Sequence, residues 1–569
     1  MLLALNGQGP LYKDLGWSAG GLEYKGVQYN IGPTPPNLAV NLVNEQNYTI
    51  TPMWNVIATL PGSLGCSEGA VIAGNHHDAW IAGGAGDPNS GSAALLEVAG
   101  ALAAMRKTGW TPIRDIVLAS WDGEEYGLVG STEWVEDHAR SLTEKAIAYI
   151  NLDVGAVGSY FKAAANPLLF GLISDAAAKV PIGDPEEGKT IADTWSGRIA
   201  TLGSGSDYTA FQDFLGIPST DMGFKNGVDD PVWMYHSNYD SFSWMEMYGD
   251  RDFIHHEAIS RLWAMMLLHL SSRDILPLNV TEYAVRLEGY LSKIKSTSSD
   301  TKLSLADLST TASKDRLSKD LLLNSYGHPA EFAYTPPNPT LLLKHKHKKH
   351  AFSLNPLPKI FSWLTKDAIT FSSHLDYLSA DIREFLLLKK PSLWNYPARL
   401  ILWRRVSEAN MVLRKFDRVW LNEDGLGGGR NWFKHIVFAP GRWTGYAGAV
   451  FPGLGESWED GDFDAWEKAK DVVRGCVDKA REKLHKATRS WNLWGNHYWY
   501  VPVQYYVVYL FNISFLHLLC TNEMFFFPSN LFLLMNPAPF LYLFSLLTRN
   551  LSSKTETNNK KKSELREYL

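Results

Sequence analysis

Cysteine is scarce in this sequence, with three residues in 569. Cys66, Cys476 and Cys520 lie far apart, so they show neither the close spacing of a structural zinc site nor a disulfide framework. The redox compartment is left open. A strong charge of either sign is also absent, because the net charge is −6 and charged residues make up 20% of the chain. Nucleic acid is therefore not expected as a partner.

A secretion signal is also missing from the start of the chain. "MLLALNGQGP" has an apolar patch much shorter than the core of a signal peptide, and no basic residue precedes it. Asn-X-Ser/Thr triplets, which permit glycosylation, weakly favour a lumenal or extracellular site. They begin at Asn47, Asn279, Asn512 and Asn550.

The last part of the chain, residues 491–569, is hydrophobic and then polar. "YWYVPVQYYVVYLFNISFLHLLCTN" and "MFFFPSNLFLLMNPAPFLYLFSLLT" contain no Asp, Glu, Lys or Arg, and each is long enough to span a bilayer. Prolines interrupt both stretches. A membrane hairpin at the C-terminus and a non-native tail sequence both remain open as interpretations.

The remaining chain divides by pattern into three parts. Residues 1–50 are rich in Gly and Pro. Residues 51–278 alternate buried strands such as "GAVIAGNH", "RDIVLASWD" and "AIAYINLD" with helical segments such as "SAALLEVAGALAAMRKTG", which predicts an α/β fold with a mostly parallel sheet. Residues 279–490 are mainly helical. They include the basic run "KHKHKKH" (344–350), which fits a solvated loop better than a metal or anion site.

Acidic and histidine residues follow the predicted strands where each strand ends. In an open α/β sheet, sites gather at this edge. Two imidazoles and three carboxylates suit a pair of zinc ions, with one carboxylate bridging both. The predicted ligands are His76, Asp87, Glu125, Asp153 and His236.

Asp87 is the expected bridge, because it lies on a Gly-rich loop that can approach both ions. A cis bond between Asp87 and Pro88 would turn the chain at that point. Asp78, two residues after His76, is placed to accept the other imidazole N–H. Glu124 adjoins the ligand Glu125 and is predicted to be a general base, which takes a proton from water and passes it to the leaving amine.

The ordered set H-x-D, D-P-N-S-G, W-D-G-E-E-Y-G-L-V-G-S, N-x-D and Y-H-S resembles the co-catalytic zinc exopeptidases of the glutamate carboxypeptidase II and transferrin receptor branch. The resemblance covers about residues 53–278 and resumes at about 408–485, which is similar to the helical dimerisation domain of the family. It implies a homodimer that cleaves peptides, with an α/β zinc peptidase domain before an all-α dimerisation domain. It also implies a membrane-associated protein whose catalytic domain is lumenal or extracellular.

The same resemblance assigns roles to individual residues. It implies that His76 and Asp153 hold one zinc ion, that Glu125 and His236 hold the other, and that Asp87 bridges them. It further implies substrate contacts from Tyr235, Tyr446 and the "GSGSD" loop (203–207), which includes Ser204 and Gly205. Glu133 and Glu136 match calcium ligands of the family, although on sequence alone they fit a solvated helix face.

The chain departs from the family in two respects. Relatives begin with a cytoplasmic tail, a transmembrane helix and an inserted apical domain, of which residues 1–50 resemble only the end. The chain thus resembles an N-terminally truncated member. Gly445 also replaces a pocket lysine of glutamate carboxypeptidase II, and Asp221 and Gly223 replace its arginine patch. We therefore expect broader specificity than for acidic peptides.

Three functional hypotheses follow. The first is a dizinc exopeptidase of carboxypeptidase or dipeptidase type, because all five ligands and the base are present. The second is a catalytically inactive receptor, scaffold or truncated fragment. The third is a protein whose C-terminus anchors it in a membrane.

Overall fold

The computed structural model describes residues 2–33, 41–64, 68–300, 352–388, 396–443 and 445–493. The chain divides into two compact units, Met1–Trp54 and Asn55–Leu569. The first unit contains short 3₁₀ turns at Leu2–Leu5, Tyr12–Leu15 and Glu23–Lys25. The second unit holds the predicted peptidase and helical regions.

A seven-stranded sheet forms the centre of the peptidase region, with the order β1-β3-β2-β4-β7-β5-β6. Four of its six neighbouring strand pairs are parallel, and β1–β3 and β5–β7 are antiparallel. The prediction of a mostly parallel sheet is therefore confirmed, with an antiparallel edge strand. The strands are β1 (Val56–Leu60), β2 (Ala70–His76), β3 (Asp115–Trp121), β4 (Ala146–Asn151), β5 (Tyr160–Ala165), β6 (Ile199–Ala200) and β7 (Ser219–Lys225).

The central strands are buried on both faces, which explains why they appear in the sequence as continuous apolar runs. In β2, Val71 and Ala73 point into the core on one side, whereas Ile72 points into the core on the other. This alternation follows the two-residue period of a strand. Helices must therefore cover both faces of the sheet.

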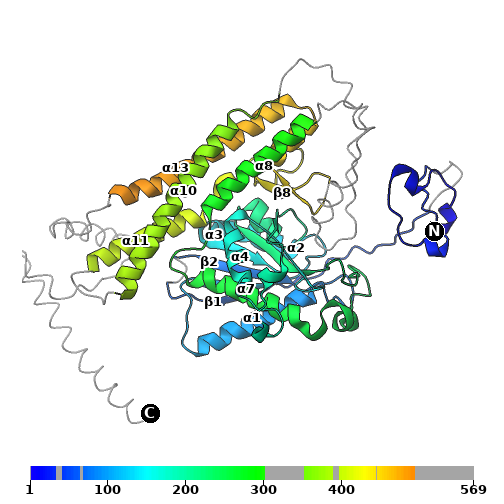
Figure 1. Cartoon of the computed structure of the whole chain (residues 1–569), viewed down its shortest axis with the longest axis horizontal. Coiled ribbons are helices and arrows are strands. Elements are labelled where there is room, and N and C mark those ends of the chain that lie inside the picture. The colour runs from blue at the N-terminus through cyan, green and yellow to red at the C-terminus, as the bar shows by residue number, and fades with distance from the viewer. Residues whose placement is uncertain are drawn as a thin grey trace, which may run out of the picture. The chain divides into compact units, whose positions relative to one another are not determined.

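Helices α1 (Asn89–Lys107) and α7 (Ile254–Ser272) pack together on the face of Val71 and Ala73 (Figure 1). The opposite face carries α2 (Val129–Asp137), α3 (Ala139–Lys145) and the π-helical turn Ala210–Phe214. Shorter helices are α4 (Phe170–Ala177), α5 (Ile191–Thr194) and α6 (Phe242–Trp244).

The helical region packs as a bundle in which α8 and α13 both contact α10 (Figure 1). A two-stranded hairpin, β8 (Phe438–Pro440) and β9 (Gly448–Val450), lies in the segment 438–453, which contains several Gly and Pro residues. The helices are α8 (Val280–Asp300), α10 (Leu357–Ile382), α11 (Tyr396–Arg414), α12 (Pro452–Glu459) and α13 (Phe463–Leu493).

Two sequence predictions fall outside the described residues. These are the basic run at 344–350 and the hydrophobic tail after residue 493. Within the described ranges, every helix is too short or too polar to cross a bilayer.

Candidate metal centre

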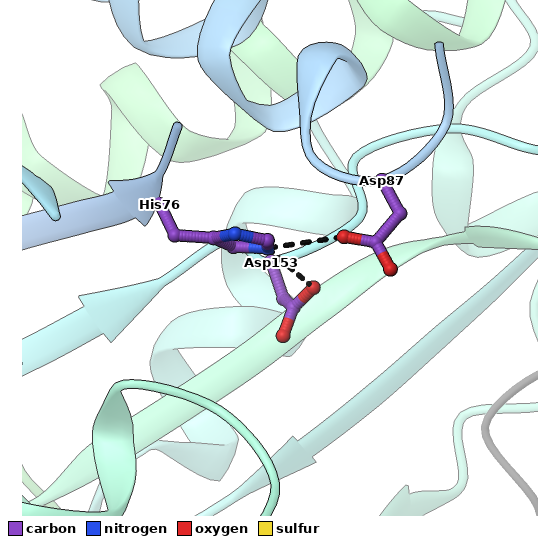
Figure 2. Close-up of side chains that lie close together, drawn as sticks. All are labelled: His76, Asp87 and Asp153. Atoms are coloured by element: carbon purple, nitrogen blue, oxygen red, sulfur yellow. Dashed lines mark hydrogen bonds and ion pairs between the residues drawn. The ribbon is translucent and has the colours of Figure 1, made fainter. Parts of the chain in front are cut away.

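All five predicted ligands converge at the carboxyl edge of the sheet, in two groups that share Asp87. His76, Asp87 and Asp153 form one group, and Asp87, Glu125 and His236 form the other. His76 is the last residue of β2, and Asp153 follows β4, so adjacent parallel strands deliver both side chains to one edge. In Figure 2 the ring of His76 faces Asp87, which lies on the loop before α1. Asp153 lies below the ring in the same view.

In the first group, a histidine nitrogen faces two carboxylate oxygens. Nε2 of His76 lies 3.1 Å from Oδ1 of Asp87 and 3.3 Å from Oδ1 of Asp153. Its Nδ1 lies 3.1 Å from the carbonyl oxygen of Asp78 and 3.5 Å from the Oδ1 of that residue. Either acceptor would hold the ring proton on Nδ1, which leaves the lone pair of Nε2 directed at two carboxylate oxygens. Such an arrangement calls for a cation between them.

The spacing of these atoms suits a small metal ion. Ligand atoms about 2.1 Å from a tetrahedral zinc ion lie about 3.4 Å from one another. Nε2 of His236 lies 3.2 Å from Oδ2 of Asp87 and 3.1 Å from Oε2 of Glu125, which is similar to the spacing in the first group. The donor set therefore fits two ions bridged by Asp87.

The protonation of the histidines also reflects an excess of negative charge. Burial alone would lower the pKa of His76, but its hydrogen bonds with Asp153, Asp78 and Asp87 raise that pKa well above the ordinary value. Burial likewise opposes protonation of His236, whereas Asp87 and Glu125 raise its pKa to about 9. Without metal, protons neutralise the carboxylates where a cation would otherwise lie.

Asp78 holds the turn that carries the predicted base. Its Oδ1 accepts the Glu124 N–H at 3.0 Å, and its Oδ2 accepts the Glu125 N–H at 3.1 Å. Burial raises the pKa of Asp78, but the hydrogen bonds from His76 and these two N–H groups outweigh it and lower the pKa. Asp78 thus stays ionised and links His76 to both glutamates.

Glu124 lies buried beside the metal groups and lines the cavity. Burial raises its pKa well above the ordinary value, and the charge of Asp153 raises it further. A carboxylate with a raised pKa is a better proton acceptor near neutral pH.

A cavity of about 1210 Å³ opens over the metal groups. The ring of Tyr235 stacks on that of His236, with centroids 3.6 Å apart. Tyr446, which comes from the β8–β9 hairpin, lies against the 203–207 loop: a Cβ on Gly205 would be 1.9 Å from its ring. The cavity lining includes the predicted substrate residues Tyr235, Ser204, Gly205 and Tyr446.

Glu133 and Glu136 lie on α2, and neither belongs to the two metal groups found among the described residues. Oε1 of Glu136 accepts a hydrogen bond from Trp432 Nε1 at 2.5 Å. Calcium binding by this pair stays a prediction.

Two supporting residues were not foreseen from the sequence. Oδ1 of Asp221 accepts from Asn151 Nδ2 and from the backbone N–H of Asp153, at 3.0 and 3.2 Å. Nδ2 of Asn75 donates to the carbonyl groups of Leu152 and Asp153. Both act through the backbone around a ligand. The one available signal was that Asn75 lies next to the end of β2; Asp221, the third residue of β7, gave no such signal.

The positions that replace basic residues of glutamate carboxypeptidase II have different surroundings. Asp221 and Gly223 are on β7, and Asp221 lines the cavity with a carboxylate already engaged by Asn151. Gly445 has a φ of +61°, which favours glycine.

Comparison with known families supports the domain order. Residues 55–249 match peptidase family M28, and residues 352–485 match the transferrin receptor-like dimerisation domain. The second match begins at residue 352. The resemblance described in the sequence analysis begins later, at about residue 408.

Several relatives align over most of the chain. A probable glutamate carboxypeptidase of Arthroderma benhamiae is 35% identical over 473 residues, which are 81% of this chain and 55% of that protein. A probable glutamate carboxypeptidase of Arabidopsis thaliana is 31% identical, over 79% of this chain and 56% of that protein. Vacuolar protein sorting-associated protein 70 of Saccharomyces cerevisiae is also 31% identical, over 76% and 48%. The chain spans about half the length of these relatives.

Solved structures are more distant. A zinc aminopeptidase from Bacillus subtilis is 21% identical, with a TM-score of 0.30 over 37% of this chain and 48% of that chain. The family assignment rests on the sequence comparisons. The chain joins a peptidase family M28 domain to a transferrin receptor-like dimerisation domain, as in the glutamate carboxypeptidase II and transferrin receptor-like family.

Proposed function

We propose that the protein is a dizinc exopeptidase of carboxypeptidase or dipeptidase type. The single observation that carries this proposal is the convergence of two ligand groups on a shared carboxylate, Asp87, beside a buried glutamate. In the proposal, His76 and Asp153 hold one ion, and Glu125 and His236 hold the other. When bound, two zinc ions would acidify a water molecule and polarise the scissile carbonyl group.

Glu124 is the proposed general base. Its carboxylate accepts a proton from water as the water oxygen attacks the carbonyl carbon. It then donates that proton to the leaving nitrogen as the C–N bond breaks, so it returns to its ionised form. Asp78 holds Glu124 and Glu125 in place through their backbone N–H groups.

Tyr235, Ser204, Gly205 and Tyr446 are proposed to bind the substrate, because they line the cavity next to the ligands. The missing basic residues at Asp221, Gly223 and Gly445 support a specificity broader than acidic peptides. Homodimerisation through the helical region, calcium at Glu133 and Glu136, and a lumenal or extracellular, membrane-associated and glycosylated protein are proposals from the family resemblance.

The test compares the full chain with its Glu124→Gln variant. Glutamine keeps the shape of the side chain but cannot accept the proton. We expect both proteins to contain about two zinc ions by elemental analysis, and the variant to lose about 10²–10⁴-fold in kcat on a peptide library. Equal rates would refute the base. Folded wild-type protein without zinc would instead favour the receptor or scaffold hypothesis.

A further inference from the structure

Asp240 is a buried carboxylate outside the two ligand groups. It lies four residues after His236, and its side chain is 1% exposed. Its Oδ1 accepts the Gly86 N–H at 2.8 Å, and its Oδ2 accepts the Asp87 N–H at 3.1 Å. Both oxygens are therefore turned toward the backbone of the loop that carries the shared ligand.

The backbone of Asp240 contacts the same loop. Its carbonyl oxygen accepts the Ala85 N–H at 3.2 Å. Gly83 packs so closely that a Cβ there would lie 2.4 Å from that carbonyl oxygen. Asp240 thus binds three successive N–H groups, from residue 85 to residue 87, and a glycine permits the close approach.

The segment that carries Asp240 also carries His236. The Asp240 N–H donates to the Ser237 carbonyl oxygen at 2.9 Å, which closes a tight turn after the histidine. His236 itself has a φ of +51°, so its backbone is held in the left-handed region. Nε2 of His236 lies 3.2 Å from Oδ2 of Asp87. The segment 236–240 therefore contacts Asp87 twice, through the His236 ring and through the Asp240 carboxylate.

We infer that Asp240 is a positioning residue that fixes Asp87 relative to His236 and thereby sets the metal affinity of the centre. Hydrogen bonds to an ionised acceptor are stronger than neutral ones, and partners behind metal ligands commonly change affinity by about 10–100-fold. The effect should be larger for the Asp87–Glu125–His236 group, because Asp240 binds the backbone of Asp87 and the residue after His236. This inference rests on the proposed zinc centre.

The first experiment measures zinc affinity of the full chain by competition with a chromophoric chelator. The Asp240→Asn variant keeps the size of the side chain but turns one acceptor oxygen into a donor that faces an N–H group. We expect one of the two zinc sites to bind about 10–100-fold more weakly, and the other to change less. At saturating zinc, kcat should return to within a few-fold of wild type, because Asp240 does not touch the reacting atoms.

Asp230→Asn is the matched control. The Asp230 carboxylate also accepts backbone N–H groups, from Ser159 and Gly227, but it holds a neighbouring loop rather than the ligand loop. The zinc affinity of the Asp230→Asn variant should equal that of wild type. Equal affinity in Asp240→Asn and wild type would overturn the inference.

Asp240→Glu is a second variant, for use if the Asp240→Asn protein does not fold. It keeps the charge and both acceptor oxygens but displaces them by one methylene, so zinc affinity should fall by less than in Asp240→Asn and still fall below that of the Asp230 control. Wild-type affinity in Asp240→Glu, when Asp240→Asn cannot be measured, would likewise overturn the inference. Wild-type protein that binds no zinc would refute the proposed centre itself, which is a distinguishable result.

Discussion

Two buried clusters of aspartate and histidine in the described chain differ in what faces their lone pairs. The first, which we call the domain junction, consists of Asn166, Gln212, Asp417 and His435. Oδ2 of Asp417 accepts from Asn166 and Gln212 at 2.9 and 3.0 Å, and His435 Nε2 lies 3.3 Å from its Oδ1. His435 Nδ1 accepts hydrogen bonds from two backbone N–H groups. The ring proton is therefore on Nε2, which donates a hydrogen bond to Oδ1 of Asp417.

At the metal centre the same residue types meet without enough donors. His76 and His236 each turn Nε2 toward two carboxylate oxygens. The Asp417 carboxylate is stabilised by hydrogen bonds from donors within the protein, whereas the metal centre needs a cation or protons from outside. Residue type alone therefore does not distinguish a ligand site from a structural network. The supply of donors does.

Removal of metal should have the largest effect on this contrast. Zinc that binds only the folded chain, at about 1,000 times its Kd, adds about 4 kcal/mol per ion to the free energy of unfolding. A strong chelator should remove that contribution, as measured by urea unfolding with and without the chelator. Unchanged stability after complete zinc removal would show that the centre holds no tightly bound ion.

Asp417→Ala should act at the junction and spare the metal centre. Three buried donors would lose their acceptor, so the free energy of unfolding should fall by about 3–5 kcal/mol. Zinc content per folded chain should stay at the wild-type value, as measured by elemental analysis. Asp460→Ala is the control, because its pair with Arg442 is exposed and contributes at most about 1 kcal/mol. A drop in zinc content would mean that the two clusters are coupled.

Asp213→Asn should have a smaller effect, and of opposite sign. The Asp213 carboxylate is fully buried and has no hydrogen-bond partner among the described residues. Burial and the charge of Asp417 raise its pKa well above the ordinary value. Because the folded pKa exceeds the unfolded one, its contribution to stability is favourable only below about pH 4 and is lost as the pH rises.

Asparagine carries no charge, so Asp213→Asn should raise the free energy of unfolding by about 1–3 kcal/mol at pH 7. The gain should shrink toward pH 4. Urea unfolding of both proteins across this range measures it, with exposed Asp460→Asn as the control. A gain that does not vary with pH would argue against a raised pKa.

Much of the peptidase region was predictable, because its physics is local. The runs that become β2, β3 and β4 are largely apolar, β2 and β4 end in the polar residues His76 and Asn151, and Asp122 follows the end of β3. Parallel strands bring those ends to one edge, so His76, Glu125 and Asp153 could be placed together before any coordinates. The predicted cis bond at Asp87-Pro88 is also present.

The supporting contacts were not predictable, because they join segments that lie far apart in the sequence. Asp240 lies 154 residues from Gly86, and Asn166 lies 251 residues from Asp417. A hydrogen bond from a backbone N–H group leaves no residue pattern at the donating position, because every residue except proline carries such a group. The antiparallel pairing of β1 with β3 is similar, since a short β-prone piece does not specify its neighbour or direction.

The contact between Tyr446 and Gly205 has a consequence for synthesis of the chain. All five proposed ligands precede residue 237, and Tyr446 lies 210 residues after His236, the last of them (446 − 236). At about 5–20 residues per second, a ribosome needs about 10–42 s to add that stretch. During this interval the growing chain already carries every ligand but lacks one wall of the cavity. Metal that binds during synthesis would therefore enter an incomplete cavity.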